Sequence, residues 1–357
     1  MTKSNPKILV AMSGGVDSAA SATLLKEQGY TPVGVTMVLN RSADPLSCGN
    51  GDEVADAAAL CALLGIEHMA VDYTAQFRAS VIDPFVRAYE AGETPNPCIL
   101  CNRTMKFGRL LSLADELGCE KIATGHYARV RYDAESGKYQ LLRAKNETKD
   151  QTYVLYFLSQ SELSRILFPL GEFGSKDEVR AIVRDVRPDN ASKKESQDIC
   201  FVPSGDYAAF IENYTKKSYP HGDFIDIKGT RLGEHRGLIH YTVGQRKGLG
   251  LALGAPMYVK EKSVADQTVT LATDAELYTD SCRVGELCFT SGEVPSAPFH
   301  CTVKTRYSAK EVGATVEAPD ECGTATVHFD TPVRAVTQGQ SAVFYSGEIV
   351  LGGGKIL

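Results

Sequence analysis

Short apolar runs alternate with helical patterns from residue 7 to about residue 205. The runs that predict strands and helices are, in chain order, Lys7–Met12, Ser18–Gln28, Pro32–Leu39, Asp52–Leu64, Ile66–Asp72 and Lys121–Thr124. Gly29 and Gly65 follow the two helical runs and predict their ends. Strands that alternate with helices form a parallel sheet, so the sequence predicts an α/β domain whose ligands bind beyond the carboxyl ends of the strands.

The pattern changes around residues 205–225 and changes again after about residue 280. Gly222–Gly254 is rich in glycine and basic side chains, which predicts a small β-rich module with a basic face. Beyond it, short alternating runs separated by turn residues predict a small antiparallel barrel. We therefore expect an α/β domain over 1–205, a central β-rich domain over 206–278 and a C-terminal β-barrel over 279–357.

The composition is that of an ordinary globular protein, with 43% hydrophobic and 23% charged residues among 357. The N-terminus lacks the apolar core of a signal peptide, and no run is long enough to span a membrane. We expect a cytoplasmic protein without a membrane partner. A net charge of −6 argues against a surface coated in basic groups, although a local basic patch remains compatible with it.

The most informative segment is the loop from Ala11 to Ser18, which reads AMSGGVDS between a predicted strand and a predicted helix. Gly14 and Gly15 let the backbone N–H groups approach an anion, and the helix N-terminus adds its dipole. Asp17 can hold a Mg²⁺ ion that bridges phosphate oxygens. No lysine follows the glycines, so the loop differs from that of kinase-like NTPases. The alternative is an ordinary capped Gly-Gly turn.

Met37 lies near the end of the predicted strand Pro32–Leu39, and Gly125-His126 follows the predicted strand Lys121–Thr124. The carboxyl ends of parallel strands meet at one edge of a sheet, so these residues are expected to share a pocket with the loop. His126 can equally be a structural histidine. The loops Asn40–Gly51 and Asp189–Ser196 are rich in polar and turn residues, and we expect both to be mobile.

Cysteines form the second candidate site. Cys98 and Cys101 follow Pro97 at the predicted start of a helix that runs through Leu117, and Cys200 lies in a separate segment. A helix N-terminus lowers the pKa of a thiol and favours the reactive thiolate. Small buried thiols explain Cys61 and Cys119 better than this pair. A zinc site would need a fourth ligand, which leaves sulfur chemistry by a persulfide relay or a three-cysteine iron–sulfur cluster.

Taken together, the motifs resemble those of the tRNA-specific 2-thiouridylases, which place sulfur on the wobble uridine of certain tRNAs. The resemblance covers nearly the whole chain and rests on SGGVDS from Ser13, TPNPCILCNRTMKF from Thr94, ATGHYARV from Ala123, KDQTYVLYFL from Lys149, ESQDICF from Glu195, YTVGQRKGLG from Tyr241 and GQSAVFY from Gly339. It implies a pyrophosphatase-type (PP-loop) domain that uses ATP and Mg²⁺ to adenylate the base.

The resemblance also assigns residues. Those implied to bind ATP are Ala11, Met12, Ser13, Gly14, Gly15, Val16, Asp17, Ser18, Met37 and Gly125. Those implied to contact the target base or other parts of the tRNA are Asn96, Pro97, Cys98, His126, Lys149, Asp150, Gln151, Arg306, Tyr307 and Gln340. Cys200 would carry a persulfide, and Cys101 would be the nucleophile that closes a disulfide with it. The partners implied are tRNAs for Lys, Glu and Gln and a sulfur donor or carrier protein, and we expect a monomer.

Many members of this family have Asp where this chain has Cys98. A thiol is a weaker proton shuttle than a carboxylate but a better ligand for iron. Cys98, Cys101 and Cys200 can therefore hold a 4Fe–4S cluster as an alternative route for the sulfur. A PP-loop amidating ligase and a passive tRNA- or nucleotide-binding protein remain as rivals, but neither would use the three cysteines.

Overall fold

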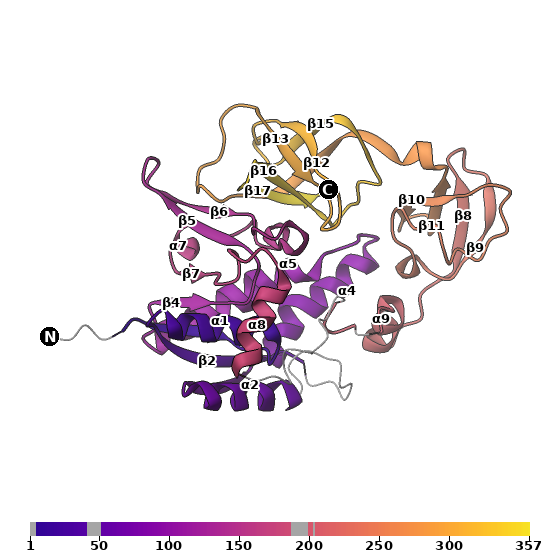
Figure 1. Cartoon of the computed structure of the whole chain (residues 1–357). Helices are drawn as coiled ribbons and strands as arrows, with labels where there is room; N and C mark the ends of the chain where they lie inside the picture. Colours follow the sequence, from indigo (N-terminus) through magenta and orange to yellow (C-terminus); the bar gives the residue numbers. More distant parts are fainter. Residues whose placement is uncertain (1–4, 41–50, 187–198, 203) are drawn as a thin grey trace.

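The computed structural model describes residues 5–40, 51–186, 199–202 and 204–357. The two loops expected to be mobile, Asn40–Gly51 and Asp189–Ser196, lie largely or wholly outside these ranges. The structure confirms the predicted fold class, with a parallel sheet, a β-rich central module and an antiparallel barrel (Figure 1).

The N-terminal sheet has five parallel strands in the order β3-β2-β1-β4-β7. Their bounds are β1 Lys7–Ala11, β2 Thr31–Val38, β3 Glu67–Asp72, β4 Lys121–Ala123 and β7 Ile166–Leu167. Ile8 and Val10 of β1 face the core formed with α1, α2 and α8, whereas Leu9 faces the opposite core with α6. Burial on both faces explains why β1 is a continuous apolar run.

Helices cover both faces of the parallel sheet. Their bounds are α1 Val16–Glu27, α2 Gly51–Leu64, α3 Thr74–Phe77, α4 Asp83–Glu90, α5 Pro97–Cys101, α6 Leu110–Glu116, α7 Gln160–Leu163 and α8 Lys176–Val186. The helix predicted from Pro97 consists of α5, a π-helical stretch over Asn102–Arg109, and α6. A second π-helical stretch, Arg78–Ile82, joins α3 to α4, and short 3₁₀ turns span Glu147–Lys149 and Thr152–Val154.

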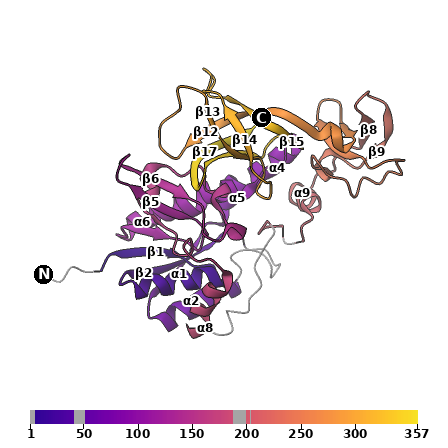
Figure 2. The ribbon, with the colours of Figure 1, turned by 45° about the horizontal axis from the view of Figure 1, so that its top comes forward.

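The central module begins with α9 (Tyr207–Thr215) and contains a four-stranded sheet in the order β10-β11-β8-β9. Its strands are β8 Gly222–Asp226, β9 Arg231–His235, β10 Tyr258–Ser263 and β11 Thr268–Ala272, with 3₁₀ turns at Leu238–His240 and Asp274–Leu277. Phe224 and Tyr241 are in its apolar core. Both views place this module beside the barrel and away from the parallel sheet (Figures 1 and 2).

The C-terminal barrel contains six antiparallel strands, and pairing of β12 with β17 closes it. Its strands are β12 Tyr278–Phe289, β13 Phe299–Lys304, β14 Val312–Val316, β15 Ala325–Arg334, β16 Ser341–Ser346 and β17 Ile349–Ile356. A hairpin from the N-terminal part of the chain, β5 (Arg129–Asp133) with β6 (Lys138–Leu142), extends the barrel sheet through the pair Leu142 and Ile349. The sequence pattern missed this hairpin and β14.

Closure of the barrel depends on Gly352, whose φ of +151° is one that other residues rarely adopt. A methyl group there would overlap the carbonyl oxygen of Cys288 on the facing strand. We predict that Gly352→Ala lowers the free energy of unfolding by about 2–5 kcal/mol, from backbone strain together with overpacking. Urea unfolding monitored by tyrosine fluorescence measures the loss.

Gly347→Ala is the matched control, because Gly347 also has a positive φ, of +56°, but no atom lies within 4 Å of the added methyl group. It should cost about 1–2 kcal/mol, the strain of a left-handed alanine alone. Equal losses of unfolding free energy in the two variants would show that the close approach of Gly352 to Cys288 does not contribute to the cost of the substitution.

Candidate functional site

The loop after β1 is tightly folded around its own serines. Ser18 Oγ accepts a hydrogen bond from the Ser13 backbone N–H at 3.2 Å and donates one to the Gly15 carbonyl oxygen at 3.0 Å. Gly14 has a φ of +69°, and a methyl group on it would lie 2.8 Å from the Glu53 carbonyl oxygen of α2. The position therefore requires glycine for both its conformation and its close contact.

Helix α1 begins at Val16, directly after this turn. The N–H groups in the first turn of a helix have no carbonyl partner within it, and the helix dipole makes this end partly positive. The structure thus places a set of donors at the carboxyl edge of β1, in the arrangement that binds phosphate groups.

Asp17 is the acceptor at the centre of a polar cluster that the sequence did not reveal. Its Oδ1 atom accepts hydrogen bonds from the Tyr127 hydroxyl at 2.8 Å and from Lys176 Nζ at 2.6 Å. The Lys176 side chain is only 11% exposed. A lysine at the first residue of a helix is disfavoured by the dipole, so the Asp17 carboxylate accounts for the position of this ammonium group. A lysine at the start of a helix is the one feature of the sequence that could have pointed to a nearby acidic partner for Lys176.

Gly125 lies against the same loop, because β4 neighbours β1 in the sheet. A methyl group on Gly125 would come within 2.9 Å of Asp17 Cβ and 3.1 Å of the Ser18 backbone nitrogen. Met37, near the end of β2, is partly buried and packs against two apolar clusters. The structure thus brings Gly125 directly to the loop, with Met37 on the strand at the other side of β1.

The cysteine pair lies at the start of α5. Asn96 caps this helix, since its side chain accepts a hydrogen bond from the Cys98 backbone N–H at 3.1 Å. Cys98 is exposed, whereas Cys101 is buried. The π-helical stretch begins at the residue after Cys101. Such stretches are uncommon and often occur at functional sites.

Cys101 and Cys200 meet at one apolar cluster although they are far apart in the sequence. Cys101 is part of the cluster that contains Phe77, Phe85 and Phe201, and Cys200 packs against it from its margin. Met37 packs against this same cluster. The residues predicted to bind nucleotide and those predicted to move sulfur are therefore connected through a shared core.

Two buried polar atoms flank the cysteine pair without a hydrogen-bond partner in the described part of the chain. They are Thr94 Oγ1, before α5, and Asn102 Oδ1, directly after Cys101. The Asn102 amide nitrogen donates to the Val154 carbonyl oxygen at 3.0 Å, which fixes the direction of its side chain. Unsatisfied buried polar atoms are rare in folded proteins and mark places where a ligand can supply the missing partner.

His126, predicted to contact tRNA, is buried. Its Nδ1 atom lies 2.6 Å from Thr124 Oγ1, and its ring lies against Phe107 and Phe168. Burial, with a smaller contribution from the Lys106 charge, lowers the pKa of His126 well below its ordinary value. The buried environment therefore favours the neutral form of the imidazole.

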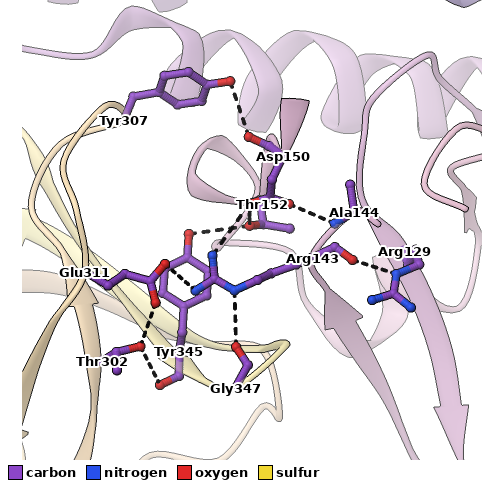
Figure 3. A network of polar contacts seen from close by, with 10 residues as sticks. All are labelled: Arg129, Arg143, Ala144, Asp150, Thr152, Thr302, Tyr307, Glu311, Tyr345 and Gly347. Atoms are coloured by element: carbon purple, nitrogen blue, oxygen red, sulfur yellow. Dashed lines mark hydrogen bonds and ion pairs between the residues drawn. The ribbon is translucent and has the colours of Figure 1, made fainter. Parts of the chain in front are cut away.

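The segment from Lys149 to Gln151 is held mainly by internal contacts. Asp150 accepts hydrogen bonds from the Ala144 backbone N–H at 2.9 Å and from Thr152 Oγ1 at 2.5 Å (Figure 3). Gln151 Oε1 accepts from the Tyr127 backbone N–H at 2.9 Å. Burial raises the pKa of Asp150. These side chains order the loop beside the nucleotide-binding edge, and all three residues, Lys149, Asp150 and Gln151, are partly exposed.

Arg143 links this loop to the barrel. Its guanidinium group lies over the Tyr345 ring at 3.8 Å and pairs with Glu311 at 2.7 Å, with Asp150 at 4.0 Å on its other side (Figure 3). Tyr307, also on the barrel, donates a hydrogen bond to the Asp150 carbonyl oxygen at 3.3 Å. The sequence did not single out Arg143 or Glu311, because their contact joins two domains.

Tyr307 is a predicted tRNA residue of the C-terminal domain whose hydroxyl is influenced by the charge of Cys98. Burial raises the pKa of its hydroxyl, and the Asp150 carboxylate and the Cys98 thiol add to this increase. Tyr307 as a whole is 44% exposed. Tyr307 and Cys98 are thus an exposed pair from two domains that can border one substrate.

Arg306 and Gln340 use their polar groups within the protein. The Arg306 guanidinium donates to the carbonyl oxygens of Val243 and Ala335 and to Thr337 Oγ1. The Gln340 amide donates to the Thr94 carbonyl oxygen at 2.7 Å. Both side chains join elements of different domains, and the tRNA contacts that the resemblance implies for them remain predictions.

No three His, Cys, Asp or Glu side chains within the described ranges converge as ligands for a metal ion. Cys98, Cys101 and Cys200 all belong to these ranges. The iron–sulfur alternative for these three cysteines remains a prediction. In the same ranges, no helix is both long and apolar enough to cross a membrane.

Three family profiles match the chain in succession. They are described as "tRNA methyl transferase HUP domain" over residues 6–204, "tRNA methyl transferase PRC-barrel domain" over 208–273 and "Aminomethyltransferase beta-barrel domain" over 279–356. Curated relatives named "tRNA-specific 2-thiouridylase MnmA" match over their full length. The protein of Acetivibrio thermocellus is 46% identical over 99% of both chains, and that of Roseiflexus sp. is 44% identical over 98% of this chain and 99% of its own.

We predict that Lys176→Met weakens binding of Mg²⁺–ATP roughly tenfold to hundredfold, since a charged hydrogen bond contributes about 1.5–3 kcal/mol. The variant loses the cation next to the phosphate-binding loop and leaves Asp17 with Tyr127 alone. Calorimetric titration with a non-hydrolysable ATP analogue measures the change. Lys138→Met, which removes a pair with the exposed Glu293, is the control and should bind ATP normally. Equal affinity of both variants would exclude a role for Lys176.

Proposed function

The chain belongs to the tRNA-specific 2-thiouridylase family, and we propose that it uses ATP to replace the 2-oxygen of the wobble uridine with a sulfur carried by Cys200. Lys, Glu and Gln tRNAs are the substrates that we propose. The observation that carries this proposal is the shared apolar cluster of Cys101, Cys200 and Met37, beside a loop suited to pyrophosphate.

Adenylation is the first step. The 2-oxygen of uracil attacks the α-phosphorus of ATP, the bond to the β-phosphate oxygen breaks, and pyrophosphate leaves. The N–H groups at the start of α1 stabilise the charge that accumulates on the leaving group. Mg²⁺ held by Asp17 would neutralise phosphate charge, with Lys176 adjacent to share that task. The poor leaving oxygen of the base thereby becomes part of AMP.

Sulfur transfer is the second step. The terminal sulfur of a Cys200 persulfide attacks C2 of the base, and the carbon–oxygen bond to AMP breaks. The Cys101 thiolate then attacks the inner sulfur of Cys200, which forms a Cys101–Cys200 disulfide and leaves the second sulfur on the base. A thiol reductant must return the disulfide to two thiols, and a sulfur donor must reload Cys200, before the next turnover.

The contacts of the structure refine the proposed tRNA surface. Cys98 and Tyr307 are exposed on facing domains, and Asn96 and Pro97 hold the first turn of α5 beneath them. The target base must leave the anticodon stack to reach this position. Thr94 Oγ1 and Asn102 Oδ1, from the residues that precede and follow the cysteine pair in the sequence, lack hydrogen-bond partners in the described part of the chain, and a bound base is the partner that we propose for them. Five other predicted tRNA residues make hydrogen bonds inside the protein, and we propose that they hold this surface in place: His126, Asp150, Gln151, Arg306 and Gln340.

The central module offers the phosphate-binding part of this surface. Lys228, Arg236, Arg246 and Lys247 are exposed on it, whereas His235 is buried. Exposed basic groups bind the RNA backbone without reading its sequence. This agrees with a local basic patch on a protein of net charge −6.

Cys200→Ser should abolish formation of 2-thiouridine while leaving tRNA-dependent pyrophosphate release within about twofold of the native rate, because adenylation precedes the sulfur step. Liquid chromatography of digested tRNA measures 2-thiouridine, and a coupled phosphate assay measures pyrophosphate release. Cys322→Ser, at an exposed thiol of the barrel, is the matched control and should thiolate normally. Thiolation by Cys200→Ser would contradict the relay; an amidating ligase or a passive binder would be indifferent to the substitution.

The iron–sulfur alternative has a separate test. We expect the protein purified without oxygen to contain no stoichiometric iron or acid-labile sulfide and to thiolate unmodified tRNA from a persulfide donor. In that case Cys98 contacts the base and is not a cluster ligand. A content of roughly four irons per chain, with activity lost on chelation, would replace the relay by a 4Fe–4S route.

A further inference from the structure

The turn between α4 and α5 is the place where all three parts of the protein meet. Helix α4 ends at Glu90, and the chain passes through Gly92–Thr94 before α5 begins at Pro97. Figures 1 and 2 show α4 and α5 between the parallel sheet and the barrel. This short turn leads directly into the helix that carries Cys98 and Cys101.

The barrel holds both backbone groups of Thr94. The Thr94 N–H donates to the Gln338 carbonyl oxygen at 2.9 Å, and the Thr94 carbonyl oxygen accepts from the Gln340 side chain at 2.7 Å. Gly339 lies between them with a φ of +90°, and a methyl group on it would come within 2.9 Å of Glu93 Cβ. The barrel thus holds this turn through one backbone and one side-chain hydrogen bond.

A charged contact adds to this attachment. Lys355 of β17 pairs with the Glu93 carboxylate, at 2.8 Å from Oε2 and 3.0 Å from Oε1. The two side chains are 33% and 17% exposed. A partly desolvated, bidentate contact of this kind fixes geometry better than a surface ion pair does.

The central module reaches the same turn from another side. Lys262 of β10 directs its ammonium group to the carbonyl oxygens of Glu93, at 3.4 Å, and Tyr241, at 3.0 Å. Val264 lies so near that a methyl group on Gly92 would be 3.1 Å from its side chain. Burial lowers the pKa of Lys262 to about 8. The module therefore places a partly buried lysine on the backbone that precedes the cysteine helix.

The connection from this turn to the cysteines is stiff. Pro95 and Pro97 flank Asn96, and each proline fixes its own φ and restricts the residue before it. Asn96 in turn caps α5 through the Cys98 N–H. A displacement of Thr94 is thus passed on to Cys98 instead of being absorbed by a flexible loop.

We propose that Gln340, Lys355 and Lys262 are positioning residues, through which the two C-terminal domains set the place of Cys98 and Cys101. Docking of tRNA on the central module and barrel then aligns the cysteine helix with the target base. The inference rests on the proposed function, since it concerns the sulfur-transfer step of that same site. It gives Gln340 a role through Thr94 and not through the tRNA.

The test compares Gln340→Met and Lys355→Met with a conservative variant and a matched control. Lys355→Arg keeps the charge at Glu93 and should restore most of the lost rate. Glu348→Gln removes a different contact between the barrel and the N-terminal domain, its pair with Arg129 at 2.9 Å, and should behave as the native protein. Thermal unfolding of each variant establishes that it is folded.

Three rates or affinities are measured for each folded variant: the dissociation constant for unmodified tRNA, pyrophosphate release, and single-turnover thiolation. We expect the two Met variants to lose about tenfold or more in thiolation, the scale of a small misplacement at a reacting centre. Affinity for tRNA and pyrophosphate release should stay within about twofold of native values, because neither depends on cysteine alignment.

Two results would overturn the inference. If Gln340→Met weakens tRNA binding in proportion to its loss of thiolation, Gln340 contacts tRNA directly. If both Met variants thiolate at the native rate, the contacts with Glu93 and Thr94 do not position the cysteines. Absence of 2-thiouridine with the native protein would instead refute the proposed function. The native protein is therefore assayed in parallel, so that a failure of the proposed function is distinguished from a failure of the positioning role.

Discussion

Two-sided burial of β1 is the constraint on which the other features depend. Ile8 and Val10 face one core and Leu9 the other, so a shift of this strand by one residue would place each side chain in the wrong core and disrupt the packing of both. A fixed β1 fixes the loop at its end, where Gly14 and Gly15 turn the chain into α1. Because β4 pairs with β1 and β2 with its other side, Gly125 and Met37 reach the same edge.

The sequence predicted those features whose causes are local. The glycine turn, the strand before it and the helix after it are encoded within a single segment, and the proline-bounded start of α5 is similarly self-contained. The π-helical stretch after Cys101 was not foreseen, since its hydrophobic pattern resembles that of an α-helix. The sequence therefore predicted that Cys98 and Cys101 lie in one helical turn, but it did not predict the π-helical geometry that follows.

Contacts between distant segments could not be predicted from one sequence. Lys176 follows Asp17 by 159 residues, and no local pattern identifies the carboxylate that it meets. The same holds for Arg143 with Glu311, and for Gln340 with Thr94. A motif indicates which residue types matter, while burial decides whether a side chain faces a substrate or the protein, as His126 illustrates. The resemblance to the family implied the chemistry and the residues that carry it, whereas the internal hydrogen bonds of these residues became visible only in the structure.

The hairpin of β5 and β6 also has a consequence for synthesis of the chain. Leu142 pairs with Ile349, which is 207 residues further along. At about 5–20 residues per second, translation leaves the outer edge of β6 without its partner for roughly 10–40 seconds. An unpaired strand edge invites pairing with other chains, so the nascent protein is most vulnerable during this interval. Slow codons in the barrel would lengthen that exposure, whereas slow codons before the hairpin would not.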